Sequence, residues 1–273
     1  MEPLLTQIAE RAQRQYYGKY RGFVVDNEDP EQRGRLKVRV PSVLGDQTLG
    51  WALPCLPFGG LANQGLFMVP EIDSQIWVEF EEGNLERPIW VGVFWQQGAD
   101  VPEEAAKTPP TTRVLRTPSG HVLQFDDADG EEQFRLAHPS GAEMIIDPQG
   151  TVNLTDASGN SVVLDAASNA LTISDASGNE IVMDSAGTTV SDSNGNKIVM
   201  AASGIDVKGA QIVLDGSMVA VGGQGGEPLL KGATFLSLFA THMHTCTAPG
   251  SPTSPPIPTG QESSALTTAA FAK

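Results

Sequence analysis

The residues best suited to chemistry form a His-x-His motif, His242 and His244, in the last part of the 273-residue chain. In an extended segment alternate side chains share a face, so both imidazoles could point inward. Three copies around one axis would then supply six nitrogens, an octahedral set that suits a transition metal. Cys246 is a weaker additional ligand. The alternative is a short helix over residues 235–244, which the helical spacing of its apolar residues favours.

The other reactive residue types do not form a catalytic constellation. A metal-dependent hydrolase would need carboxylates near the histidines, and residues 228–261 contain none. The sequence also has no G-x-S-x-G motif and no Walker loop. His121 and His138 are expected to be surface or structural residues. We therefore predict that the chain is not an enzyme.

Charge and cysteine content limit the partners and the compartment. The formal net charge of −16 repels phosphate backbones, so nucleic-acid binding is not expected. Cys55 and Cys246 suggest neither a disulfide framework nor a CxxC metal site, which favours a reducing compartment. Residues 1–18 lack the apolar run of a signal peptide, and no stretch reaches the length of a membrane span. The expected site of synthesis is the cytoplasm, without ordinary secretion.

The chain must position these residues on β structure. Residues 1–16 predict a short docking helix, because Leu4, Leu5 and Ile8 recur at spacings of three and four. Residues 17–97 predict a small OB-fold barrel of five strands, at 20–25, 35–41, 51–56, 75–80 and 88–95. Its tryptophans are expected in the core or at protomer contacts. Residues 98–112 form a proline-containing linker.

A repeat occupies residues 113–226. Ser-Gly or Asn-Gly pairs recur every 17 to 21 residues, first at Ser119-Gly120 and last at Asn194-Gly195. The strand after each turn carries large apolar residues at matching offsets. These residues, which we predict to form a shared core, are Leu123, Phe125, Met144, Ile146, Val162, Leu164, Ile181, Met183, Ile198 and Met200. Asp165 and Asp184 recur as turn residues rather than as acid–base pairs.

A fixed repeat of this length predicts stacked strands. With two strands per repeat, one chain offers two walls and cannot enclose a core alone. Three intertwined chains would close a β-prism and remove exposed strand edges. We therefore favour an all-β fold: an OB-fold barrel followed by an intertwined trimeric β-helix.

The segment from Asp26 to Arg35 follows a D-N-x-D-P-x-x-x-G-R pattern between two strands. With the repeats that follow, it resembles phage baseplate assembly protein V and the valine–glycine repeat protein G (VgrG) of type VI secretion. The resemblance implies a homotrimeric spike that punctures a target envelope in a phage, type VI or extracellular injection particle. It also implies a baseplate hub at the N-terminal end, a transient contact with the target membrane, and an iron held by the His-x-His.

The C-terminal segment, residues 227–273, is expected to close the prism. Its proline-rich tail cannot extend a strand ladder, so we predict a blunt platform. The resemblance to type VI proteins suggests that a cone-shaped PAAR-repeat protein sits there. A different class of function stays open, namely a single-chain β-solenoid adhesin or glycan-binding module. Such a module should carry aromatic stripes, yet residues 135–234 contain no Phe, Trp or Tyr.

Overall fold

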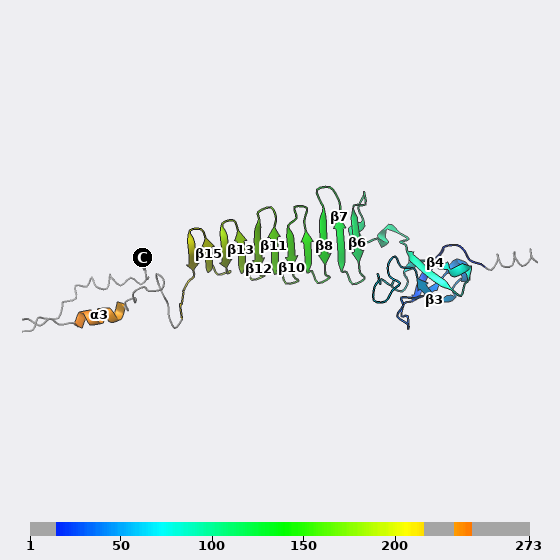
Figure 1. Cartoon of the computed structure of the whole chain (residues 1–273), viewed down its shortest axis with the longest axis horizontal. Coiled ribbons are helices and arrows are strands. Elements are labelled where there is room, and N and C mark those ends of the chain that lie inside the picture. Colours follow the sequence, from blue (N-terminus) through cyan, green and yellow to red (C-terminus); the bar gives the residue numbers. More distant parts are fainter. Residues whose placement is uncertain (1–14, 216–231, 242–273) are drawn as a thin grey trace, which may run out of the picture. The chain divides into compact units, whose positions relative to one another are not determined.

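The computed structural model describes residues 15–215 and 232–241, apart from the side chains of three residues in the second range. Strands dominate this part of the chain, and the helices are few and short (Figure 1). None of the described helices is long and apolar enough to cross a membrane. The all-β prediction is confirmed.

The first five strands form a closed barrel. They are β1 (Tyr20–Asp26), β2 (Leu36–Arg39), β3 (Thr48–Pro54), β4 (Gln75–Phe80) and β5 (Pro88–Val93). Their order around the barrel is β1-β2-β3-β5-β4, and all neighbours are antiparallel except β3 and β5. A one-turn helix, α2 (Pro41–Leu44), follows β2, and a 3-10 turn, η1 (Glu81–Gly83), follows β4.

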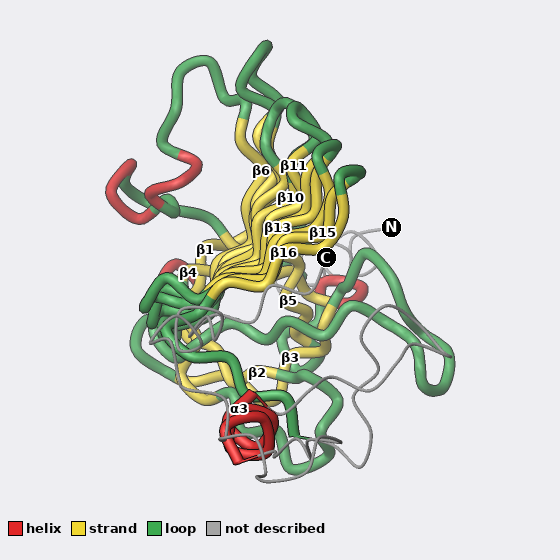
Figure 2. Tube along the Cα trace, turned by 90° about the vertical axis from the view of Figure 1, so that its left-hand side faces the viewer, coloured by secondary structure: helices red, strands yellow, loops and turns green. Residues whose placement is uncertain are grey.

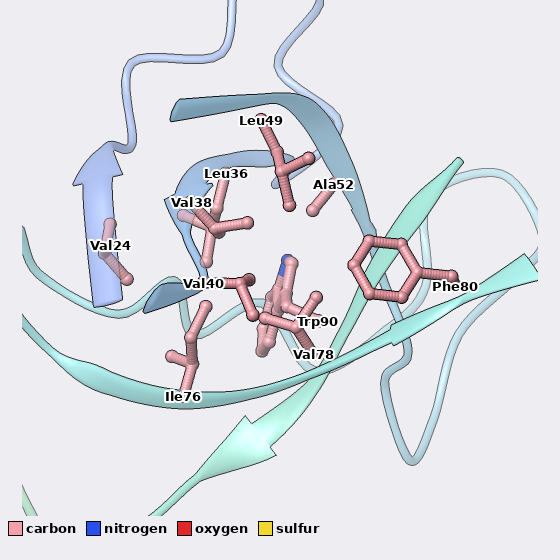
Figure 3. Close-up of a cluster of buried hydrophobic side chains, with 10 residues drawn as sticks. All are labelled: Val24, Leu36, Val38, Val40, Leu49, Ala52, Ile76, Val78, Phe80 and Trp90. Carbon is pink, nitrogen blue, oxygen red and sulfur yellow. The ribbon is translucent and has the colours of Figure 1, made fainter. Parts of the chain in front are cut away.

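The barrel core follows from the alternation of these strands. In β2 and β4 every second residue points inward, and Leu36, Val38, Ile76 and Val78 have no exposed surface. Figure 3 shows the cluster that they form with residues of the other strands. Gly22 is required beside this core, because a Cβ there would lie 3.0 Å from the Arg39 carbonyl oxygen.

The turn between β1 and β2 is built around one buried carboxylate. Asp29 accepts hydrogen bonds from the Arg35 guanidinium, with Nε at 3.0 Å, and from the backbone N–H groups of Glu31 and Arg33. This bonding holds the pKa of Asp29 well below its usual range, chiefly through Arg35. Gly34 adopts a left-handed φ of +74° and offers its carbonyl oxygen to the Trp90 indole N–H at 3.0 Å. The D-N-x-D-P-x-x-x-G-R pattern therefore encodes a self-bonded turn.

The tryptophans divide between the core and the surface. Trp90 is buried, Trp77 is half-buried, and Trp95 is 59% exposed. The Arg21 guanidinium lies 5.8 Å from the centre of the Trp77 ring, a cation–π contact that the sequence analysis did not foresee.

The linker is fastened to the polar face of the sheet that follows. It contains two 3-10 turns, η2 (Gly98–Asp100) and η3 (Glu103–Ala105). Lys107 forms an ion pair with Asp126, whose carboxylate also accepts hydrogen bonds from the hydroxyls of Thr111 and Thr112. Hydrogen bonding, chiefly from Lys107, lowers the pKa of Asp126 to about 2. Arg116 binds Glu103 at 2.7 Å and also pairs with Glu104.

Eleven strands then form one meandering sheet in strict sequence order. They are β6 (Thr112–Arg116), β7 (Val122–Asp126), β8 (Gln133–Ala137), β9 (Glu143–Ile146), β10 (Val152–Thr155), β11 (Ser161–Asp165), β12 (Ala170–Ser174), β13 (Glu180–Asp184), β14 (Gly187–Ser191), β15 (Lys197–Ala201) and β16 (Gly204–Lys208). Figure 2 shows them stacked behind one another. The two strands of each repeat are neighbours in this sheet, so one chain provides a single continuous wall rather than two.

Aspartates form the repeated turns at one end of the strands. Asp175 Oδ1 accepts the backbone N–H groups of Ser177 and Asn179, both at 2.9 Å, and Oδ2 accepts the Asn179 side-chain amide at 2.6 Å. Asp156 and Asp192 repeat this arrangement two strands away on either side. Asp165 and Asp184 cap turns at the other end of the strands, which agrees with the turn role expected for them.

The chain divides into two units, residues 1–207 and 208–273. In the second unit the structure describes one helix, α3 (Gly232–Thr241), in which the rings of Phe235 and Phe239 stack at 6.0 Å. The predicted docking helix, apart from its last residues, and most of the predicted C-terminal platform lie outside the described residues.

Candidate interaction face of the sheet

Cross-strand register aligns the apolar residues of the repeat in two continuous rows on one face, here called the apolar face. Row 1 runs through Leu115, Leu123, Leu136, Met144, Leu154, Val162, Ile173, Ile181, Val190 and Ile198. Row 2 runs through Phe125, Phe134, Ile146, Val152, Leu164, Leu171, Met183, Thr188 and Met200. All ten residues predicted for the shared core lie in these rows, five in each.

The opposite face is more polar. Glu180 lies there between Ser174 and Ser191, and further along Ser161 bonds Ser174 through their hydroxyls at 2.8 Å. This is the face that the linker covers, since Asp126 is only 5% exposed. The sheet therefore has one face that the described residues partly cover and one that they leave open.

No residue of either row is buried within one chain. Leu136 is 50% exposed, Leu164 47% and Phe125 46%. A groove of about 1100 Å³ follows row 1 from Leu115 to Val190. Monomeric proteins rarely expose a continuous apolar surface of this extent, and such surfaces mark interaction sites. The apolar face is the candidate functional site of the chain.

The structure describes two of the four histidines for which the sequence makes predictions. His121 and His138 are exposed and stand at the first two turns of one sheet edge, with ring centres 4.8 Å apart. His242, His244 and Cys246 lie outside the described residues, so the metal site stays a prediction. Within the described residues no group of three or more His, Cys, Asp or Glu side chains could hold a metal ion.

Comparison with known proteins identifies a family model and a curated relative. Residues 20–95, which contain the barrel, match the family model described as the type VI secretion system/phage-baseplate injector OB domain. The chain is also similar to the pre-baseplate central spike protein Gp5 of Enterobacteria phage T4, with 38% identity over 63 residues. That match covers 20% of this chain and 11% of Gp5. Both findings confirm the resemblance to a baseplate-spike or VgrG-like protein.

Two solved structures show only weak similarity. The G-box domain of the microcephaly protein CPAP aligns with a TM-score of 0.26 and 13% identity, over 38% of this chain and 72% of that domain. The TCP domain of SAS-4 (dCPAP) from Drosophila melanogaster, solved with a proline-rich motif of Ana2, gives 0.25 and 15%, over 55% and 99%. Scores this low do not establish a common fold.

Proposed function

We propose that the chain is the homotrimeric central spike of a contractile injection machine, a structural protein without catalytic activity that punctures the target envelope. The observation that carries the proposal is the pair of rows, which are apolar at every position except Thr188 and none of whose members is buried by the described part of the chain. Fully burying an aliphatic or aromatic side chain stabilises a protein by roughly 1.5–3 kcal/mol. Eighteen such positions leave a large free energy available to association.

Three copies account for the geometry better than one or two. A single sheet has two faces and two edges, so one chain cannot enclose its own apolar face. Three walls around an axis make a closed prism in which each apolar face meets the other two. The polar faces, with the carboxylates at the turns, then point to water and keep the assembly soluble.

The strand arrangement suits a mechanical role. Consecutive strands are hydrogen-bonded along the whole sheet, so a force along the stack is transmitted from strand to strand without a break in the backbone hydrogen bonding. The acidic surface gives no basis for stable binding to anionic lipid headgroups, which fits a transient contact with the target membrane. Synthesis in the cytoplasm and assembly onto a baseplate hub complete the proposal.

The deciding experiment is native mass measurement of the purified chain. We expect a species near three times 28.9 kDa that resists detergent and heat. Sedimentation as a monomer at micromolar concentration would overturn the proposal. A stable dimer would leave the apolar face as the interface but refute the prism.

The C-terminal predictions need their own measurements. Elemental analysis of the purified trimer should find one transition metal per three chains if His242 and His244 bind it on the axis. Deleting residues 246–273 should abolish binding of a cognate PAAR-type cone without dissolving the trimer. A trimer without metal refutes only the histidine prediction, and a truncated spike that still binds a cone refutes only the platform.

A further inference from the structure

The loop between β3 and β4, residues 55–74, is the second exposed apolar feature of the described chain. No charged residue occurs from Gln47 to Pro70, although the chain carries 50 Lys, Arg, Asp and Glu residues in 273. Phe58 is 61% exposed, Leu61 75% and Phe67 66%. The barrel core does not need these side chains, because it is complete without them.

Contacts within the loop fix its conformation. Its neck is closed by a hydrogen bond from the Leu66 N–H to the Phe58 carbonyl oxygen at 3.1 Å. Gly59 and Gly65 face each other at this neck with φ values of +140° and +154°, and a Cβ on Gly59 would lie 3.3 Å from the Gly65 Cα. Larger residues would force the two arms apart.

The C-terminal arm of the loop is tied to the self-bonded turn of the barrel. The Asn27 side-chain amide donates to the Pro70 carbonyl oxygen at 3.1 Å. The Phe67 ring packs over Gly34, where an added Cβ would lie 3.2 Å from the ring. A loop held at its neck and at one arm presents its apolar tip with little ordering entropy left to lose on binding.

We infer that this loop is the contact between the barrels of neighbouring copies in the trimer. The inference rests on the proposed function, and it concerns a part of the chain that the sheet assembly does not explain. Identical chains of net charge −16 repel one another, so close approach of two copies is opposed least where charge is absent. The longest uncharged stretch of the barrel meets that condition.

The size of the loop also favours a second copy over an independent partner. Stand-alone interfaces use about 20–30 residues from each side, far more than one loop provides. Barrels whose chains are already joined through their sheets need a smaller contact area to associate. Each linker is fastened to its own sheet through Lys107 and Arg116, so only a short tether joins barrel to sheet. The effective concentration of the barrels is then about millimolar, at which a small apolar contact suffices.

Cys55, exposed at the start of the loop, provides the test. The full chain is prepared as Cys246→Ser, and a short bis-maleimide is added at micromolar concentration. We expect efficient covalent dimers within the native trimer. Replacing Phe58 and Leu61 by serine, which leaves the Phe67 anchor in place, should lower the yield by about tenfold or more, because two apolar side chains are lost from the contact. The trimer mass should stay unchanged.

Two further variants test whether the change in crosslinking is specific to the loop. Val93→Ser removes a side chain that is 54% exposed outside the loop and should leave crosslinking unchanged. Leu61→Ser alone, at the most exposed position, should lower the yield without affecting the barrel fold. A trimer that crosslinks equally with and without the loop side chains, or not at all, overturns the inference and leaves the spike intact. A monomeric chain overturns the proposed function and the inference with it.

Discussion

The barrel and the sheet use the same alternation of apolar and polar residues and reach opposite results. In the barrel the inward residues form a closed cluster, with Leu36, Val38 and Ile76 fully buried. In the sheet the hydrophobic residues that one chain buries are Val122 and Ala137, both on the face that the linker covers. The barrel completes its core within one chain, and the sheet does not.

The difference arises from closure. Five strands with strong curvature bring β1 and β4 together, so the barrel has no free edge and an inside that nothing else must fill. Eleven strands in sequence order extend in one direction and never return. Alternation therefore specifies which face is apolar, whereas topology decides whether that face is covered by its own chain or must be covered by others.

The largest expected effect is a charge in row 1. Ile181 lies between Ile173 and Val190, so Ile181→Asp would bury three carboxylates near the prism axis. An uncompensated buried charge costs about 3–5 kcal/mol, which three copies multiply. We expect loss of the trimer at micromolar concentration, as measured by analytical ultracentrifugation.

The neighbouring residue supplies the control. Glu180 is exposed on the opposite face, and Glu180→Lys should assemble and melt like the parent. If Ile181→Asp also trimerises normally, the apolar face is not the interface, and the comparison between barrel and sheet loses its basis.

A cavity in the barrel tests the other side of the comparison. Leu36 is fully buried, so Leu36→Ala should destabilise the barrel by about 2–5 kcal/mol. The fluorescence of Trp90, buried in the same core, should report this unfolding, while ultracentrifugation still finds a trimer. Dissociation of the trimer by Leu36→Ala would show that the two regions do not fold independently.

Sequence reasoning succeeded where the information is local. Strand alternation placed Ile181 and Met183 on one face, and the spacing of Ser-Gly pairs located the turns, because both depend on neighbouring residues. It failed where distant residues meet. The Lys107–Asp126 pair and the packing of Phe67 on Gly34 join segments whose proximity no local pattern records. The expectation of two walls per chain was wrong. The two strands of each repeat are hydrogen-bonded to each other in one sheet, so they belong to the same wall.

Acid should release the linker before it affects the strand pairing of the sheet. Lys107 lowers the pKa of Asp126 to about 2, below the ordinary aspartate value near 4. Between these values the unfolded chain binds more protons than the native one, so the stabilisation is complete above pH 4 and is lost as pH falls towards 2. The protection of the amides of residues 98–111, taken as their hydrogen-exchange rate relative to the intrinsic rate at the same pH, should fall across this window.

Asp126→Asn is the matched variant for that experiment. It keeps the shape of the side chain but removes the charge that Lys107 binds, so the linker amides should already be less protected at pH 7, with little further loss of protection on acidification. If the parent linker is equally protected at pH 5 and pH 2, the ion pair does not hold it.

The smallest effect is expected at a turn of the sheet. The barrel has a similar aspartate turn, so the two regions can be compared directly. Asp175 and Asp29 both accept backbone N–H groups of the turn that follows them. Asp175 is only partly buried and its hydrogen bonds are exposed to water, whereas the Asp29 side chain is 3% exposed and pairs with Arg35. In Asp175→Ala water can replace the lost acceptor, so hydrogen exchange at Ser177 and Asn179 should accelerate only about three- to tenfold, with the trimer intact. Asp29→Ala leaves Arg35 without its main partner and should lower the barrel melting temperature markedly. Equal effects at the two sites would mean that burial does not distinguish the barrel turn from the sheet turn.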